Sequence, residues 1–260
     1  MRFYFASERR IFFWAIIIAL VSSTTSYAQD ANNTILQLDK KYFYPQHNGL
    51  KKLSVQIIPI QQDTVYDAER FFQLPGINFH WKKNPSGSER SFSIADVNEG
   101  TLVDRGQETL QFVKNFSEMV IPKTLQERFT DYQGKRKKTL EGRIFLSFES
   151  LNPNQNILRY DLLIDPKGLK IDKMIIHQKS GPRQVKVKLT YNKLKKFEKW
   201  QLAASVANFE LDGKPYQEIT QYFYNQVEKL SLAKKVEQTL KKDGKIIQSY
   251  TFNIVDPQIN

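Results

Sequence analysis

The sequence predicts a mainly β protein with a helical layer, an α+β fold in which an antiparallel meander forms an incomplete barrel capped by helices. Two observations carry this prediction. Apolar and polar residues alternate through most of the second half of the chain, which is typical of strands with one buried face. Between residues 107 and 134 the apolar residues instead recur at helical spacing, and amphipathic helices need a sheet face to cover.

The first 28 residues have the layout of a signal peptide. Arginines precede an apolar stretch from Ile11 to Val21, and small residues follow up to Ala28, after which we expect cleavage. As a helix the apolar stretch rises only about 16 Å, short of a bilayer core of roughly 30 Å, which argues against a membrane anchor. We therefore expect residues 29–260 to form a single domain in the periplasm, or alternatively in the medium, with no transmembrane segment after cleavage.

Composition narrows the chemistry of this exported chain. It has no cysteine, which excludes disulfides, thiolate catalysis and cysteine-bound metal. Its 39 basic and 27 acidic residues give a formal net charge of +12, which draws anionic partners. Export leaves no nucleic acid to bind, so we expect an anionic envelope surface such as phospholipid, lipopolysaccharide or acidic polysaccharide. The alternative is that the lysines only keep the protein soluble.

The N-terminal part of residues 29–260 predicts one helix and several strands. A helix near 33–43 follows from the spacing of Ile35, Leu38 and Tyr42, and it ends before Pro45. A strand is expected at residues 53–57. Two strand fragments are expected at residues 79–81 and 91–94, with a turn at residues 84–87 between them.

A helix pair is predicted at residues 107–133. The first helix carries an apolar stripe that begins at Leu110, and Pro122 opens the second, whose stripe includes Leu125 and Tyr132. Gly134 is predicted to be its C-cap, with a basic run at residues 135–138 behind it. This pair is interpreted as a layer that seals a sheet face, with a moving lid as the alternative.

The second half predicts a meander of about eight strands. Asp212-Gly213 and Asp243-Gly244 each lie between alternating segments and predict tight hairpins. In Val185–Tyr191 the apolar side chains point one way and the lysines the other, so that strand has one dry face. The expected strands cover residues 144–148, 160–164, 169–176, 185–191, 202–211, 219–223, 236–240 and 246–254.

Catalytic and metal-binding patterns are missing from the sequence. His47, His80 and His177 lie far apart and have no spacing that would place two of them on one metal ion. Asp161 and Asp165 offer a carboxylate pair of the kind that glycosidases use, but Asp165 is better explained by its turn. We therefore predict no catalytic residue, no metal site and no cofactor, with an envelope hydrolase as a third hypothesis.

Aromatic residues are abundant, with 12 tyrosines, 18 phenylalanines and 3 tryptophans in the chain. Trp81, Trp200, Tyr222 and Tyr224 are the candidate ligand-binding residues, since wide apolar cavities are lined by aromatic side chains. The alternative is that they fill an ordinary packed core.

The order of elements, together with the segment Tyr160-Asp161-Leu162-Leu163-Ile164-Asp165-Pro166-Lys167-Gly168-Leu169-Lys170-Ile171, resembles the outer-membrane lipoprotein carrier superfamily of LolA- and LolB-like proteins. That resemblance implies an open barrel closed by helices, whose cavity holds the acyl groups of a lipoprotein or another lipid. No arginine matches the family's latching residue.

The leading hypothesis is thus a periplasmic, non-catalytic carrier or receptor for a lipid or an acylated protein, with a role in outer-membrane lipoprotein sorting. The alternative is an envelope interaction protein that docks on a protein complex or an anionic polymer through a sheet face and its basic surface.

Overall fold

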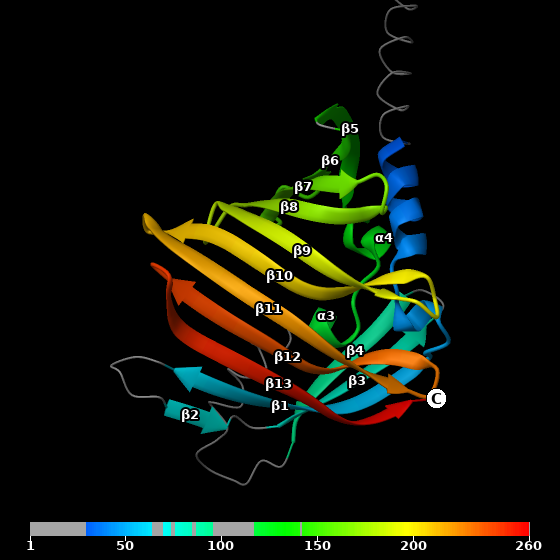
Figure 1. Cartoon of the computed structure of the whole chain (residues 1–260), viewed down its shortest axis with the longest axis vertical. Coiled ribbons are helices and arrows are strands. Elements are labelled where there is room, and N and C mark those ends of the chain that lie inside the picture. Colours follow the sequence, from blue (N-terminus) through cyan, green and yellow to red (C-terminus); the bar gives the residue numbers. More distant parts are fainter. Residues whose placement is uncertain are drawn as a thin grey trace, which may run out of the picture.

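A computed structural model of the chain describes residues 30–63, 70–73, 76–84, 87–95, 117–140 and 142–259 (Figure 1). The expected signal peptide lies outside the described residues, as do residues 107–116 of the expected helix pair. In the described part of the chain, no helix has the length and hydropathy needed to cross a bilayer.

One antiparallel sheet forms most of the described structure. Its strands follow the order β4-β3-β1-β13-β12-β11-β10-β9-β8-β7-β6-β5, and β2 pairs with β1 outside this path. The thirteen strands of the described residues are β1 (Lys52–Asp63), β2 (Arg70–Gln73), β3 (Ile77–Asn84), β4 (Gly87–Ile94), β5 (Tyr132–Leu140), β6 (Arg143–Ser150), β7 (Ile157–Asp165), β8 (Lys170–Gln178), β9 (Gln184–Leu194), β10 (Lys199–Leu211), β11 (Lys214–Val227), β12 (Leu230–Lys242) and β13 (Lys245–Ile259). The sheet is strongly curved (Figure 1).

The predicted meander is confirmed in the eight strands β6 to β13, each paired with the next. Asp212-Gly213 and Asp243-Gly244 join their strands with φ angles of 51° and 72° and of 50° and 78°. Two successive positive φ values define the tight hairpin turn that Asp-Gly predicts. The sequence did not predict that β1 pairs with β13, which places an early strand beside the last one.

The helical part is smaller than the sequence predicted. The helix expected near 33–43 spans residues 30–41, and a short 3-10 helix, η1 (Pro45–His47), follows it. The described part of the expected helix pair consists of two single turns, α3 (Ser117–Val120) and α4 (Leu125–Arg128).

The predicted helix C-cap at Gly134 is wrong, because β5 already begins at Tyr132. Gly134 is a buried strand residue beside the helix of residues 30–41. A Cβ atom there would lie 2.6 Å from Phe148 Cε1 and 3.1 Å from Ala31 Cβ. The strand and the helix of residues 30–41 approach so closely here that only glycine fits. The apolar residues up to Tyr132 have helical spacing although Tyr132 lies in a strand, which explains the wrong prediction.

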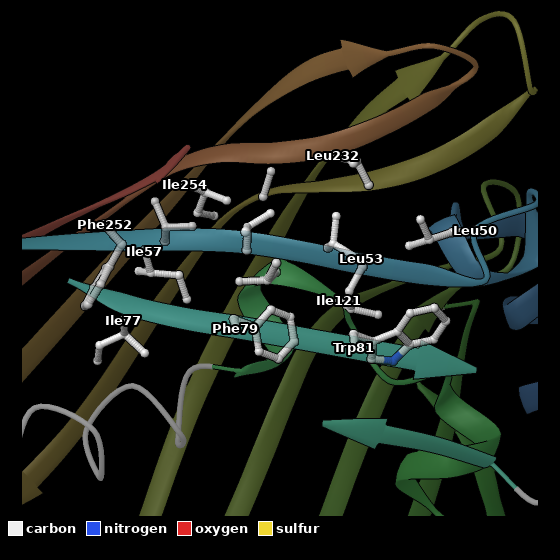
Figure 2. Packing of buried hydrophobic residues seen from close by; sticks show 14 of the residues in the cluster. Leu50, Leu53, Ile57, Ile77, Phe79, Trp81, Ile121, Leu232, Phe252 and Ile254 are labelled. Carbon is white, nitrogen blue, oxygen red and sulfur yellow. The ribbon is translucent and has the colours of Figure 1, made fainter. Parts of the chain in front are cut away.

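Two hydrophobic clusters occupy the concave side of the sheet. The first cluster joins the strands near β1 to α3, and Figure 2 shows Phe79 and Trp81 of β3 on the same side as Ile121. The second cluster joins β5–β8 to α4 and the helix of residues 30–41. The buried members of the first cluster are Leu50, Leu53, Val55, Ile57, Ile77, Phe79, Trp81, Val120, Ile121, Leu230, Leu232, Ala233, Val236, Phe252 and Ile254. Those of the second cluster are Ala31, Ile35, Leu38, Tyr42, Tyr44, Leu125, Phe129, Leu146, Phe148, Tyr160, Leu162, Ile164 and Ile171.

Candidate functional site

Between the two clusters, the concave side of β9–β12 carries half-buried residues that belong to neither cluster. We give the name open inward surface to seven of them: Val185, Val187, Ala207, Phe209, Tyr216, Glu218 and Leu240. Ser205 and Lys242 are also half-buried and share this face, because Ser205 pairs with Leu189 and Lys242 with Tyr216.

The pairing register shows that these residues form one continuous surface. Residues directly opposite each other in an antiparallel pair share a face. Val187 pairs with Ala207, Ala207 with Glu218, and Glu218 with Leu240. In the neighbouring row, Val185 pairs with Phe209, which pairs with Tyr216. The rings of Phe209 and Tyr216 stack with centroids 5.5 Å apart.

Neighbouring residues show that this face is the concave one. Leu189 and Tyr191, which continue the alternation of β9, pack against the second cluster. Tyr222, two positions beyond Thr220 on β11, packs against the first cluster and pairs with its buried member Val236. The open inward surface therefore lies between the two clusters.

An open groove of about 620 Å³ lies at the hairpin ends of the same strands. It runs between the β8–β9 turn, with Gly181 and Arg183, and the β10–β11 turn at Asp212. Phe209 and Tyr216 line this groove as well as belonging to the open inward surface. Lys186 and Asn208, which pair on the outward face, also line the groove, so it is not confined to the concave side.

Polar side chains on the concave face occur from β10 to β13, where Ser205 pairs with Thr220 and Gln248 with Leu240. Thr220 and Gln238, which pair directly, are 3% and 6% exposed. Burial raises the pKa of Glu218, and a hydrogen bond from Gln238 partly opposes that rise. Burial also raises the pKa of Tyr222 to about 12. This face can therefore offer a ligand apolar contact with one carboxyl group and its amide partner.

The helical segment on the concave side is held by the buried carboxylate of Asp39. Asp39 accepts hydrogen bonds from the backbone N–H groups of Leu125 at 2.9 Å and Gln126 at 3.0 Å, and from the Tyr44 hydroxyl at 2.6 Å. The first backbone N–H groups of a helix have no acceptor within the helix. The Asp39 carboxylate supplies the acceptor for two of these groups in α4.

Two further contacts fix the same segment. Thr124 caps α4 through a capping box with Glu127. Arg128 pairs with Glu118 of α3, so the two helical turns are tied to each other. The α3–α4 segment is thus a firmly attached cover over the clusters.

The four aromatic residues proposed from the sequence lie in two places. Trp81 is a 3% exposed member of the first cluster, and Tyr222 and Tyr224 pack against that cluster. Trp200 packs against the second cluster, and its Nε1 donates to the Gly168 carbonyl oxygen at 2.7 Å. The Tyr224 hydroxyl donates to the Leu202 carbonyl oxygen at 2.7 Å. Tyr222 and Tyr224, with ring centroids 6.5 Å apart, are neighbours.

Sequence reasoning singled out the dry face of Val185–Tyr191 but overlooked Phe209, Tyr216 and Glu218. Phe209 and Tyr216 flank the Asp-Gly turn at positions that pair directly, so the predicted hairpin was the signal that could have found them. Glu218 follows from the same alternation, because it lies two positions from each of Tyr216 and Thr220 on β11.

The three histidines are separate in the structure. His47 packs edge-on against Tyr44, and His80 Nδ1 lies 2.8 Å from the Ser54 hydroxyl. His177 Nε2 lies 2.8 Å from Asp161 Oδ2. In the described part of the chain, no group of three or more histidine, cysteine or acidic residues could hold a metal ion.

Asp161 and Asp165, considered above as a carboxylate pair, have different structural roles. Asp161 is buried on the outward face, where burial raises its pKa but hydrogen bonds from Ser147 and His177 and the charge of Arg159 lower it overall. Asp165 accepts from the Lys167 backbone N–H at 3.0 Å, as its turn predicts. Because the Ser147 hydroxyl donates to Asp161 at 2.7 Å, and not to His177, this cluster lacks the serine–histidine contact of a nucleophile with its base.

No protein-family model and no curated protein sequence matches the chain. Several solved structures are similar, including the following three. A LolA superfamily protein from Nitrosomonas europaea has 9% identity and a TM-score of 0.32 over 88% of this chain and 93% of that chain. A DUF1329 family protein from Desulfovibrio piger has 7% identity and a TM-score of 0.41 over 90% of this chain and 93% of that chain. A chain of the MucA/MucB complex of Pseudomonas aeruginosa has 9% identity and a TM-score of 0.20 over 90% of this chain and 94% of that chain.

The superfamily that the sequence resembles is thus among the similar structures.

Proposed function

We propose that this chain is a non-catalytic carrier or receptor of the periplasm that holds a lipid or the acyl chain of a lipoprotein against its open inward surface. One observation carries the proposal. Six of the seven residues of the open inward surface are apolar or aromatic, yet neither cluster packs over them. The polar residues Ser205 and Lys242 lie beside them on the same face. Ligand pockets have this composition, mostly apolar with few polar groups.

The four aromatic residues have a place in this proposal at the margins of the surface. Tyr222 and Tyr224 border it on the side of the first cluster, and Trp200 lies on the side of the second. Trp81 lies deeper, within the packing of the first cluster. In this arrangement Tyr222 is the candidate that an acyl chain on Glu218 would meet first.

The affinity for a chain of fourteen carbons sets a scale for the experiments. Burying fourteen methylene groups gains roughly 11 kcal/mol at about 0.8 kcal/mol each. Association costs at least about 4 kcal/mol, which leaves at most roughly 7 kcal/mol. That corresponds to a dissociation constant of about 10 μM or weaker.

The first experiment is native mass spectrometry of the protein purified from its own cells without detergent. We expect a lipid adduct that exchanges for added tetradecanol. A hundredfold excess of tetradecanol over its dissociation constant should add about 2.7 kcal/mol of stability and raise the melting temperature by several degrees. An adduct-free protein whose melting temperature does not respond to uncharged acyl ligands would refute the proposal.

A second candidate function, docking on an anionic envelope surface, is favoured by the outward face of β8 and β9. Lys173 and Lys188 lie directly opposite each other there, and Lys186 lies two positions along β9. Like charges in opposing positions destabilise a sheet. Among the described residues none of these three exposed lysines forms an ion pair. A polyanion would supply the missing counter-charge.

This candidate is tested with vesicles that contain phosphatidylglycerol. Replacing Lys173, Lys186 and Lys188 by glutamine should weaken salt-sensitive binding by about tenfold or more. The matched control replaces Lys195, Lys214 and Lys229, which are exposed in or beside hairpin turns, and removes the same charge elsewhere. Equal losses in the two triple variants would mean that only the overall charge matters.

A further inference from the structure

Glu218 stands out because a carboxyl group interrupts the apolar surface proposed to hold the ligand. On β11 it lies between Tyr216 and Thr220 on the concave face. Its direct neighbours across the sheet are Ala207 on β10 and Leu240 on β12, neither of which offers a polar group. The strand lies in the middle of the sheet, so the carboxyl group has no role in protecting a sheet edge.

Glu218 also has no cation of its own. Among the described residues it forms no ion pair, and the side chain of Gln238 is its hydrogen-bond partner. Lys242 pairs with Tyr216, which lies two residues before Glu218 on β11. The Lys242 ammonium group lies 5.8 Å from the centre of the Tyr216 ring. The charge of Arg128 is taken up by Glu118.

An unpaired carboxyl group in an apolar setting lowers stability, because the charged form loses water without gaining a counter-ion. A leucine or valine at this position would continue the apolar surface at no such cost. When a ligand covers the surface, the loss of water becomes larger still. A ligand that brings its own positive charge would remove this penalty, whereas a carboxylate ligand would add repulsion.

We propose that Glu218 selects apolar ligands that carry a primary ammonium group, and that the ammonium group pairs with its carboxylate while the hydrocarbon chain lies on the open inward surface. This inference rests on the proposed function, because it names the class of ligand for the same surface. Thr220 and Gln238 lie beside Glu218 on this face but are buried, so the Glu218 carboxylate is the acceptor that the ammonium group of a ligand reaches. The net charge of +12 acts against this preference, since it attracts anions at long range.

The test compares tetradecylamine, tetradecanoic acid and tetradecanol as competitors of an uncharged fluorescent probe, N-phenyl-1-naphthylamine, at neutral pH. We expect the full chain to bind the amine about tenfold more tightly than the alcohol, and the acid less tightly than the alcohol. Glu218→Gln should lower the affinity for the amine about tenfold and leave the affinity for the alcohol unchanged. Glu218→Asp should restore part of the preference.

The matched control is Glu210→Gln. Glu210 lies on β10, is exposed and carries the same charge, so its replacement changes the net charge equally. We expect it to keep the preference for the amine.

The outcomes separate the two proposals. Saturable binding of all three ligands with equal affinity to the wild-type chain would overturn the role of Glu218 and leave the proposed function standing. If none of the three ligands, nor the probe, bound saturably, the proposed function would fail together with this inference. The comparison on wild-type protein decides the matter even if Glu218→Gln does not fold.

Discussion

The two halves of the concave face differ in what covers them, although the strands beneath show the same alternation. On β5–β8 the inward residues lie under α4 and the helix of residues 30–41, and members such as Leu146 and Leu162 have no exposed surface. On β9–β12 the residues of the open inward surface remain half-buried, and they include the small Ala207 and the charged Glu218. Alternation in the sequence therefore indicates that one face of a strand is apolar. Whether other parts of the protein or a ligand cover that face depends on elements elsewhere in the chain.

The largest expected contrast between the halves is the cost of removing a side chain. Phe148 is 1% exposed and stacks on Phe129 with ring centroids 4.2 Å apart. We expect Phe148→Ala to lower the free energy of unfolding by about 3–5 kcal/mol, because it leaves a cavity. Val187→Ala on the open inward surface should cost about 1 kcal/mol or less in ligand-free protein, because little packing is lost.

Urea unfolding of both variants measures this contrast. Similar losses for Phe148→Ala and Val187→Ala, after allowance for side-chain size, would show that the two halves are packed alike and that the comparison is mistaken.

A smaller effect should follow from loosening the cover of the filled half. Asp39→Asn keeps the shape of the side chain but removes the charge that accepts from two backbone N–H groups of α4. Hydrogen bonds to charged groups contribute about 1.5–3 kcal/mol each, so we expect a loss of roughly that size. In the control, Asp30→Asn removes the half-exposed partner of Arg136, which should cost at most about 1 kcal/mol.

Hydrogen exchange shows which part of the structure is loosened in Asp39→Asn. Faster exchange of the amides of residues 125–128 in Asp39→Asn, with β9–β12 unchanged, would support the assignment. Unchanged exchange at α4 would contradict it.

The smallest effect concerns the pH dependence of the open half. Burial raises the folded-state pKa of Glu218 above its ordinary value, so the folded protein holds this proton more tightly than the unfolded chain. The contribution to stability is therefore fully present below the unfolded pKa and is lost as the pH rises through the folded pKa. We expect Glu218→Gln to gain stability relative to wild type as the pH is raised from 4 to 7.

Thermal unfolding of the two proteins across that range measures the difference. A stability difference that is constant with pH, or that changes in the opposite direction, would contradict the raised pKa. Ligand-free protein is needed, because a bound amine would reverse the sign by pairing with the carboxylate.

The sequence was sufficient for the parts of the fold that local chemistry determines. Alternation located all eight strands from β6 to β13, and Asp-Gly located two of their hairpins. It failed at residues 132–140, where Tyr132 fits a helical stripe but the position of Gly134 against Ala31 requires a strand. That requirement comes from a contact about a hundred residues distant in the chain, so no local pattern contains it.

The candidate site was predictable only in part, for the same reason. The dry face of β9 was visible in Val185 and Val187. The separation of Trp81 from Trp200 was not, because it follows from the pairing of β1 with β13 and from which cluster each strand joins. Aromatic content alone could not tell core filling from a ligand surface.

The central claim, that the open inward surface holds an uncharged acyl chain, is tested most directly by filling that surface. Ala207→Phe places a ring at its centre, and Val206→Phe places the same ring on the outward face one residue away. We predict that Ala207→Phe lowers the affinity for tetradecanol at least tenfold while changing the free energy of unfolding by less than about 1 kcal/mol. Val206→Phe should bind like wild type. Unchanged binding by Ala207→Phe, or a loss of stability typical of an overpacked core, would contradict the account.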